Sequence, residues 1–201
     1  MDGVLIDSMA IHVQAFNRVL ENTGIRLSEI DIVGRSTKEI LQDCLKGLVT
    51  SEEINRLAKK KSEVSLKSMM KMGVDLLMPD AMEVLLQLSE RYKLGLCTSA
   101  SPESASFVRN SLLQEVRFAT LVHSGDVARA KPAPDIYELA CARVASQPQD
   151  CLVVEDALSG VIAAIEAGCD VVFVGERQRA LEDLPQVSTI PDLGRLMEHF
   201  G

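Results

Sequence analysis

The later part of the chain alternates short apolar runs with helical patterns, and this alternation constrains the fold more than any other feature. Five short runs predict strands: "KLGLC" (93–97), "ATLVH" (119–123), "CLVVE" (151–155), "DVVFVG" (170–175) and "VSTI" (187–190). Helical spacing of apolar residues fills the segments between them, at 81–90, 103–113, 134–145 and 158–167. Strands that alternate with helices imply right-handed crossovers and a parallel sheet covered on both faces. The sequence therefore predicts an α/β fold.

Residues 9–78 have a different character, because they show helical spacing and no convincing strand. Breaks fall at 22–24, at 34–37 and near Gly47, and a new helix cap is expected at 50–53. This stretch predicts a small bundle of about four helices.

The composition argues against several classes of partner. The formal net charge of −8 disfavours nucleic acid and anionic membranes, which need concentrated Lys and Arg. The basic run 59–61 is flanked by Glu63 and predicts a solvated helix face. The five cysteines contain no CxxC pair, which is typical of buried thiols in a reducing compartment. The sequence has no signal peptide and no apolar run long enough to span a bilayer, so we expect a soluble cytoplasmic protein.

Polar residues follow the predicted strands at the edge where parallel sheets place their ligands. "KLGLC" leads into Thr98, Ser99 and Ala100. Hydroxyls and free backbone N–H groups at such a turn suit a phosphate group, although many turns of this kind are ordinary helix caps. "ATLVH" leads towards Lys131, which stands beside a rigid proline turn. A lysine held there would neutralise phosphate charge; the alternative is a plain surface lysine.

The third strand end carries two adjacent acids, Glu155 and Asp156, directly after "CLVV". Adjacent carboxylates at the end of a buried strand are costly unless they are paired or bind a metal. Hard oxygen ligands of this kind suit Mg²⁺, and an exposed acidic turn is the alternative. An oxyanion donor, a cation and metal ligands at one edge together describe phosphoryl transfer, but these residues include no nucleophile.

Four ordered motifs resemble the haloacid dehalogenase superfamily, and specifically its β-phosphoglucomutase-like phosphatases with a helical cap. The motifs are "MDGVLIDS" at the start, Thr98, "KPAPDIY" (131–137) and "EDALSGVIAAIEAG" (155–168). The resemblance covers the whole chain. It implies a Rossmann-like parallel-sheet core at 1–8 and 79–201, with a small α-helical cap domain at 9–78 inserted after the first strand.

The resemblance also implies a role for each matching residue of the core. Asp2 matches a general acid that later acts as a base, and its backbone carbonyl would bind Mg²⁺. Thr98, with the Ser99 and Ala100 amides, would hold the transferred phosphoryl group. Lys131 would bind both the phosphate and the nucleophile.

Further metal ligands follow from the same resemblance. Asp156 matches the side-chain ligand of Mg²⁺, and Glu155 would bind the ion directly or through water. His12 falls where relatives have a histidine near the hinge, and it would help to position Asp2. A lone helical histidine is, however, usually structural or exposed.

Basic residues of the predicted cap complete the expected substrate site: Arg35, Lys38 and Lys67. Arg35 and Lys38 belong to "GRSTKE" (34–39), where Thr37 stands at the position of a mutase arginine. This difference weakens the interpretation as a mutase without excluding it.

One departure from the family pattern is large. The first aspartate of the family's D-x-D motif, which is the covalent nucleophile, would precede Met1 together with a central strand. Two explanations stay open. Either the start of this sequence is misplaced or truncated, or the chain begins here and cannot form the aspartyl-phosphate.

The resemblance and the strand-end residues together predict a Mg²⁺-dependent phosphatase that hydrolyses a small phosphate monoester, such as a sugar phosphate, through a phosphoaspartate. The alternatives are a β-phosphoglucomutase-like phosphomutase and a catalytically inactive protein that binds a phosphorylated metabolite. We expect a monomer whose partner is a small phosphorylated metabolite, with no binding to nucleic acid or membranes.

Overall fold

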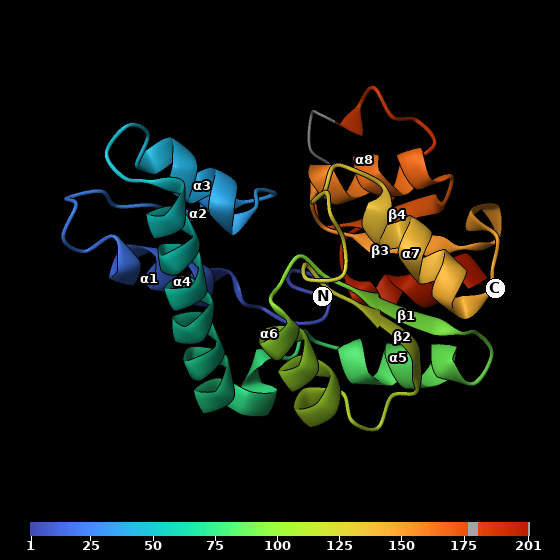
Figure 1. Ribbon diagram of the computed structural model, residues 1–201. Coiled ribbons are helices and arrows are strands. Elements are labelled where there is room, and N and C mark those ends of the chain that lie inside the picture. Colours follow the sequence, from blue (N-terminus) through green and yellow to red (C-terminus); the bar gives the residue numbers. More distant parts are fainter. Residues whose placement is uncertain (177–180, 201) are drawn as a thin grey trace. The chain divides into compact units, whose positions relative to one another are not determined.

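The computed structural model describes residues 1–176 and 181–200, and the chain divides into two compact units. The core unit consists of Met1–Asp7 and Leu77–Gly201, and the helical unit consists of Ser8–Leu76 (Figure 1). Among the described residues, no helix combines the length and the apolar composition needed to cross a bilayer.

The helical unit is a small bundle built around one long helix. Its helices are α1 (Met9–Val19), α2 (Glu29–Ile32), α3 (Thr37–Cys44) and α4 (Ser51–Met72), followed by the 3₁₀ helix η1 (Gly73–Leu76). Helices α1 and α3 both contact α4. The core between them is apolar and includes Phe16, Leu20 and Leu41. The predicted cap at 50–53 is confirmed, because the Thr50 hydroxyl accepts the backbone N–H of Glu53 at 3.2 Å.

The core unit holds all five predicted strands. They are β1 (Leu94–Cys97), β2 (Phe118–Val122), β3 (Leu152–Glu155), β4 (Asp170–Val174) and β5 (Ser188–Ile190). The α-helices are α5 (Ala81–Ser89), α6 (Pro102–Phe107), α7 (Asp135–Val144) and α8 (Leu158–Ala167). Shorter helical segments are the π-type η2 (Val108–Leu112) and the 3₁₀ helices η3 (Pro148–Asp150) and η5 (Leu193–Phe200). The helix predicted at 103–113 is therefore two segments, since its hydrogen-bond pattern changes after Phe107.

The strands form two parallel sheets (Figure 1). β1 pairs with β2 in one sheet, while β4 lies between β3 and β5 in the other. Helix α7 contacts β1 and β2, and α8 contacts β3 and β4. Apolar side chains such as Val122, Val161 and Phe173 fill the space between the strands and these helices. The prediction of an α/β fold with parallel strands is confirmed.

The first six residues form a closed turn. Asp2 and Ile6 pair in an isolated bridge, and the Gly3 N–H donates to the Ile6 carbonyl at 2.9 Å. Gly3 has a φ of +68°, which favours glycine at this position. The Met78 N–H donates to the Leu5 carbonyl at 2.9 Å. The turn therefore joins the start of the chain to the point where the chain re-enters the core unit.

Candidate active site

The residue that follows β1 contacts the start of the chain. The Thr98 N–H donates to the Val122 carbonyl at 2.9 Å and so extends the ladder between β1 and β2. The buried Thr98 hydroxyl donates to Asp2 Oδ2 at 3.2 Å and accepts the Ala100 N–H at 3.0 Å. These bonds bring the carboxylate of the first turn to the carboxyl end of a parallel strand, which is where α/β folds bind their ligands.

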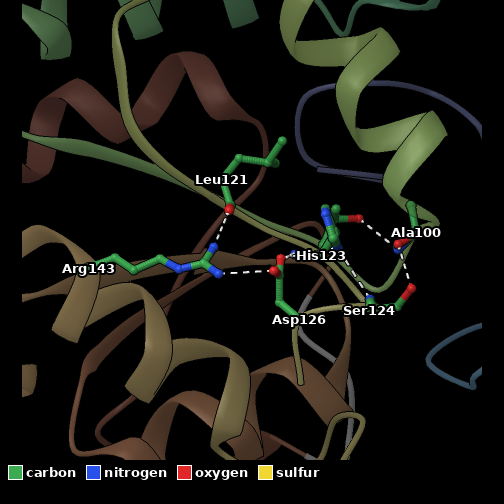
Figure 2. Close-up of polar contacts among 8 residues, drawn as sticks. Ala100, Leu121, His123, Ser124, Asp126 and Arg143 are labelled. Carbon is green, nitrogen blue, oxygen red and sulfur yellow. Dashed lines mark hydrogen bonds and ion pairs between the residues drawn. The ribbon is translucent and has the colours of Figure 1, made fainter. Parts of the chain in front are cut away.

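The loop after Thr98 is also held by the end of β2. The Ser124 hydroxyl donates to the Ala100 carbonyl at 2.8 Å, and the Ser124 N–H donates to the same oxygen at 3.2 Å (Figure 2). The N-cap of α6 is Ser101, whose hydroxyl accepts the Ser104 N–H at 3.3 Å. Thr98, Ser99 and Ala100 therefore lie before the N-cap of α6. Their loop is held by the end of β1 and by the residues that follow β2.

Figure 2 also shows an ionic network that no motif indicated. Asp126 accepts the His123 N–H at 2.9 Å and the Arg143 guanidinium at 2.9 Å, and Arg143 also donates to the Leu121 carbonyl at 2.7 Å. The His123 backbone bond and the Arg143 side chain lower the pKa of the Asp126 carboxyl. The network joins β2, the loop after it and α7.

Lys131, Tyr137 and Glu155 form a buried cluster at the end of β3. The Lys131 ammonium contacts Glu155 Oε1, and the Tyr137 hydroxyl donates to the same oxygen at 2.5 Å. Burial alone would raise the pKa of Glu155, but the Lys131 ammonium, the Met1 ammonium and the Tyr137 hydroxyl together bring it below its ordinary value. A Cβ atom at Gly160 would lie 2.2 Å from Glu155 Cδ, so this glycine leaves room for the carboxylate. The sequence indicated Lys131 and Glu155, but it did not indicate that Tyr137 joins them.

Asp156 lies against the turn that follows Asp2. A Cβ atom at Gly3 would lie 1.8 Å from Asp156 Oδ2, so only glycine fits beside this carboxylate. Burial and the neighbouring Glu155 carboxylate raise the pKa of Asp156 to about 6, against the opposing effect of the Met1 ammonium. Asp2 also raises this pKa. Asp2 and Asp156 therefore act on each other electrostatically.

In the helical unit, only part of the basic run 59–61 is solvated. Its first two lysines are exposed, but Lys61 is 6% exposed, and its Nζ lies 4.6 Å from the Phe16 ring centre. His12 Nδ1 lies 3.1 Å from Lys61 Nζ and 3.4 Å from Ser65 Oγ. The prediction of a solvated face is wrong for Lys61, because this residue falls on the buried stripe of α4. The helical spacing of the buried residues along α4 would have identified Lys61 as a buried position.

The other predicted cap residues are on the surface of the helical unit. Arg35 forms an ion pair with Asp43, and Lys38 and Lys67 are exposed. Their part in substrate binding, like that of His12, stays a prediction.

The acids of the core unit have the donor chemistry of a magnesium site. The described residues contain no group of three or more His, Cys, Asp or Glu side chains placed to hold a metal ion. Mg²⁺ at phosphate sites, however, is usually bound through one or two carboxylates together with substrate oxygens and water. Asp156 supplies one such carboxylate beside Asp2, whose backbone carbonyl is a second oxygen donor, whereas Lys131 and Tyr137 already engage Glu155. The residues present therefore fit Mg²⁺ through Asp2 and Asp156.

Comparison with known proteins identifies relatives over most of the chain. A phosphorylated carbohydrates phosphatase of Thermotoga maritima is 30% identical over 177 residues, which cover 86% of this chain and 81% of the relative. β-Phosphoglucomutase of Bacillus subtilis is 29% identical over 190 residues, which cover 90% and 83%. The crystal structure of β-phosphoglucomutase from Clostridium difficile has the same fold, with a TM-score of 0.84 at 24% identity, and the match covers 99% of this chain and 92% of the other. Residues 1–168 match the family model of haloacid dehalogenase-like hydrolases, and the chain belongs to this family.

Proposed function

We propose that the protein is a Mg²⁺-dependent phosphatase that hydrolyses a small phosphate monoester, such as a sugar phosphate, through a phosphoaspartate intermediate. The nucleophilic aspartate would lie immediately before Met1. The hydrogen bond from Thr98 to Asp2 carries the proposal. It joins a hydroxyl suited to binding phosphate with a carboxylate suited to proton transfer, at the edge of the sheet where ligands bind.

Each residue of the site would have one main task. Asp2 would donate a proton to the leaving oxygen and later accept one from the attacking water. The Thr98 hydroxyl and the Ser99 and Ala100 amides would bind the phosphoryl oxygens, with the Ala100 N–H exchanging its bond to Thr98 for one to phosphate. Lys131 would neutralise phosphate charge, since Glu155 holds its ammonium in place.

The Asp2 carbonyl and the Asp156 carboxylate would hold Mg²⁺, and Glu155 would take part directly or through water. When bound, the ion would supply positive charge that offsets the charge of the phosphate and of the nucleophile. Because Glu155 already accepts from Lys131 and Tyr137, we assign the direct side-chain contact to Asp156.

The relatives support a sugar phosphate as the substrate. The Thermotoga maritima protein is a phosphatase of phosphorylated carbohydrates. The Bacillus subtilis relative is a β-phosphoglucomutase, which supports a phosphomutase as the second candidate. A mutase would pass the phosphoryl group to a sugar hydroxyl instead of water. The proposal includes a cytoplasmic location, which the five free cysteines support because thiols persist in reducing compartments.

The test measures phosphate release from a panel of sugar phosphates. It uses the chain extended at its amino terminus by a short apolar segment that ends in aspartate, and the 201-residue chain is the matched control. We expect Mg²⁺-dependent release that falls by about 10²–10⁴-fold in Asp2→Asn, because that variant lacks the general acid and base. Transfer of labelled phosphate to a sugar hydroxyl would favour the mutase. If the extended chain neither releases nor transfers phosphate with any sugar of the panel, the proposal is wrong.

A further inference from the structure

Tyr137 contacts both members of a buried ion pair, although the proposed chemistry gives it no task. It lies in the first turn of α7, where its N–H donates to the Pro134 carbonyl at 2.9 Å. The residue is only 5% exposed. Its hydroxyl donates to Glu155 Oε1 at 2.5 Å, and its ring centre lies 4.9 Å from Lys131 Nζ. One rigid side chain therefore touches the carboxylate and the ammonium of the same pair.

The two oxygens of Glu155 differ in the kind of donor that they receive. Oε2 accepts the backbone N–H groups of Asp156 and Ala157 at 3.1 Å and 3.4 Å. Oε1 accepts the Lys131 ammonium and the Tyr137 hydroxyl. The donors to Oε2 are fixed by the backbone, whereas those to Oε1 belong to side chains, and one of these side chains is flexible.

Lys131 also lies beside the predicted phosphate-binding loop. Burial raises the pKa of the Cys97 thiol to about 11, against the opposing effect of the nearby Lys131 ammonium. Cys97 is the last residue of β1 and directly precedes Thr98. A lysine ammonium has three N–H donors on a flexible stem. From this position, Lys131 can turn its donors from Glu155 towards a phosphate group held by the loop.

Such a movement weakens the bond between Lys131 and Glu155 Oε1. A buried acceptor that loses its donor is costly, and the cost is larger for a charged group. The Tyr137 hydroxyl stays in place during the movement, because the buried ring and the first turn of α7 hold it. It therefore keeps Oε1 paired. Its ring also attracts the ammonium, since a cation is stabilised near an aromatic face.

We propose that Tyr137 is a positioning residue for Lys131: its hydroxyl keeps Glu155 Oε1 paired while the Lys131 ammonium binds a phosphate group. Without this hydroxyl, Lys131 is the one remaining side-chain donor to Oε1 in the part of the chain that the structure describes. Glu155 then retains the ammonium, and phosphate binding weakens. The inference rests on the proposed function in one respect, which is that phosphate is the group that Lys131 binds.

The test compares Tyr137→Phe with Tyr92→Phe, which removes the hydroxyl of the chain's other tyrosine. Tyr137→Phe preserves the ring beside Lys131 and removes the donor to Glu155. Tyr92 is 42% exposed and lies outside the buried cluster, so its variant is the matched control. Binding of inorganic phosphate to the 201-residue chain and to both variants is measured by calorimetric titration in the presence of Mg²⁺. The Tm of each chain is measured with and without phosphate.

Tyr137→Phe is expected to raise the Kd for phosphate by about tenfold, which corresponds to the loss of about one hydrogen bond to a charged group. Tyr92→Phe should leave the Kd unchanged. The Tm lost in Tyr137→Phe should be smaller without phosphate than with it, because Lys131 still pairs with Oε1 in the free protein. A purely structural tyrosine would lower the Tm equally in both conditions and leave the Kd unchanged, and that result would overturn the inference. Absence of saturable phosphate binding by the unaltered chain would also overturn it.

Turnover separates this inference from the proposed function. In the sugar phosphate assay, Tyr137→Phe is expected to raise KM by about tenfold and to change kcat less, since Lys131 holds the phosphate both before and during the reaction. If that assay detects no turnover while Tyr137→Phe weakens phosphate binding, the proposed function fails and the inference stands. If Tyr137→Phe and Tyr92→Phe hydrolyse a sugar phosphate with the same KM, the proposed function stands and the inference fails.

Discussion

The Glu155 carboxylate receives donors from four directions. Lys131 and Tyr137 bind one of its oxygens, and the N–H groups of Asp156 and Ala157 donate to the other at 3.1 Å and 3.4 Å. Inside a protein, a fully satisfied network of this kind is rigid, while the loss of one member leaves its partners buried and unpaired. At the scale of single residues, Glu155 therefore holds Lys131 and Tyr137 in place beside the turn at Asp156 and Ala157.

Replacing this carboxylate is expected to destabilise the core unit. Glu155→Gln preserves the shape of the side chain but removes the negative charge beside Lys131, whose side chain is 11% exposed. Breaking a buried ion pair costs about 3–5 kcal/mol, so we expect the free energy of unfolding to fall by about 3 kcal/mol in a urea titration. Glu198→Gln, which removes an exposed partner of Arg195, is the matched control and should change little. Equal losses in the two variants would contradict this reasoning.

At the scale of elements, the loop after β2 organises its neighbours. Ser124 holds the Ala100 carbonyl of the loop after β1, and Asp126 holds Arg143 of α7. Loops on a protein surface are usually more mobile than the elements that they connect. Here one short loop is bonded on both sides, so it couples the predicted phosphate-binding loop to α7.

The Asp126 network predicts a dependence of stability on pH. The lowered pKa means that the Asp126 carboxylate stabilises the fold fully above the ordinary carboxyl value, and that this contribution disappears as pH falls through the lowered value. We expect Asp126→Asn to reduce the free energy of unfolding by about 1–2 kcal/mol at about pH 7. The reduction should be smaller at about pH 3, where the unfolded carboxyl is mostly protonated. Urea unfolding at both pH values measures this, and a loss that is the same at both would refute the ionic explanation.

At the scale of the whole molecule, the core unit is discontinuous in sequence. It combines residues 1–7 with residues 77–201. Asp2 comes from the first part, while Thr98 and Asp156 come from the second. The candidate site therefore exists only when both parts have folded together.

Binding of Mg²⁺ is expected to stabilise this discontinuous unit. An ion that binds only the folded state raises the Tm by mass action, and the proposed ligands Asp2 and Asp156 come from the two parts. Saturating Mg²⁺ should therefore raise the Tm of the chain with the aspartate extension, measured by calorimetry. Asp156→Asn should reduce this shift, whereas Glu198→Gln should preserve it. An equal shift in the two variants would exclude Asp156 as a ligand.

Much of the fold could be predicted from local patterns. β3 and β4 lie within the runs at 151–155 and 170–175, because buried parallel strands are apolar at nearly every position. β2 begins at Phe118, one residue before its predicted run, and ends before His123. His123 instead lies in the following loop, where its N–H reaches Asp126. The sequence predicts the ends of strands less accurately than their centres. A polar residue at such a position fits the last position of a strand and the first position of a loop equally well.

The contacts of the candidate site were harder to predict from the sequence than its strands and helices. Lys61 falls in a basic run that looks solvated, yet the packing of α4 buries it beside His12. Tyr137 lies within a quoted motif, but its contact with Glu155 crosses from α7 to β3. Such partners come from different elements and leave no local pattern.

The sequence by itself determined the alternation of strands and helices, the turn at Asp2–Gly3 and the types of residue at the strand ends. These features depend on neighbours along the chain, and spacing and composition are sufficient to indicate them. Only the tertiary structure decided that Thr98 contacts Asp2 across 96 positions and that Lys131 pairs with Glu155 across 24. The physical reason is that packing selects such partners in space, and burial then decides which of their charges and backbone groups must be satisfied.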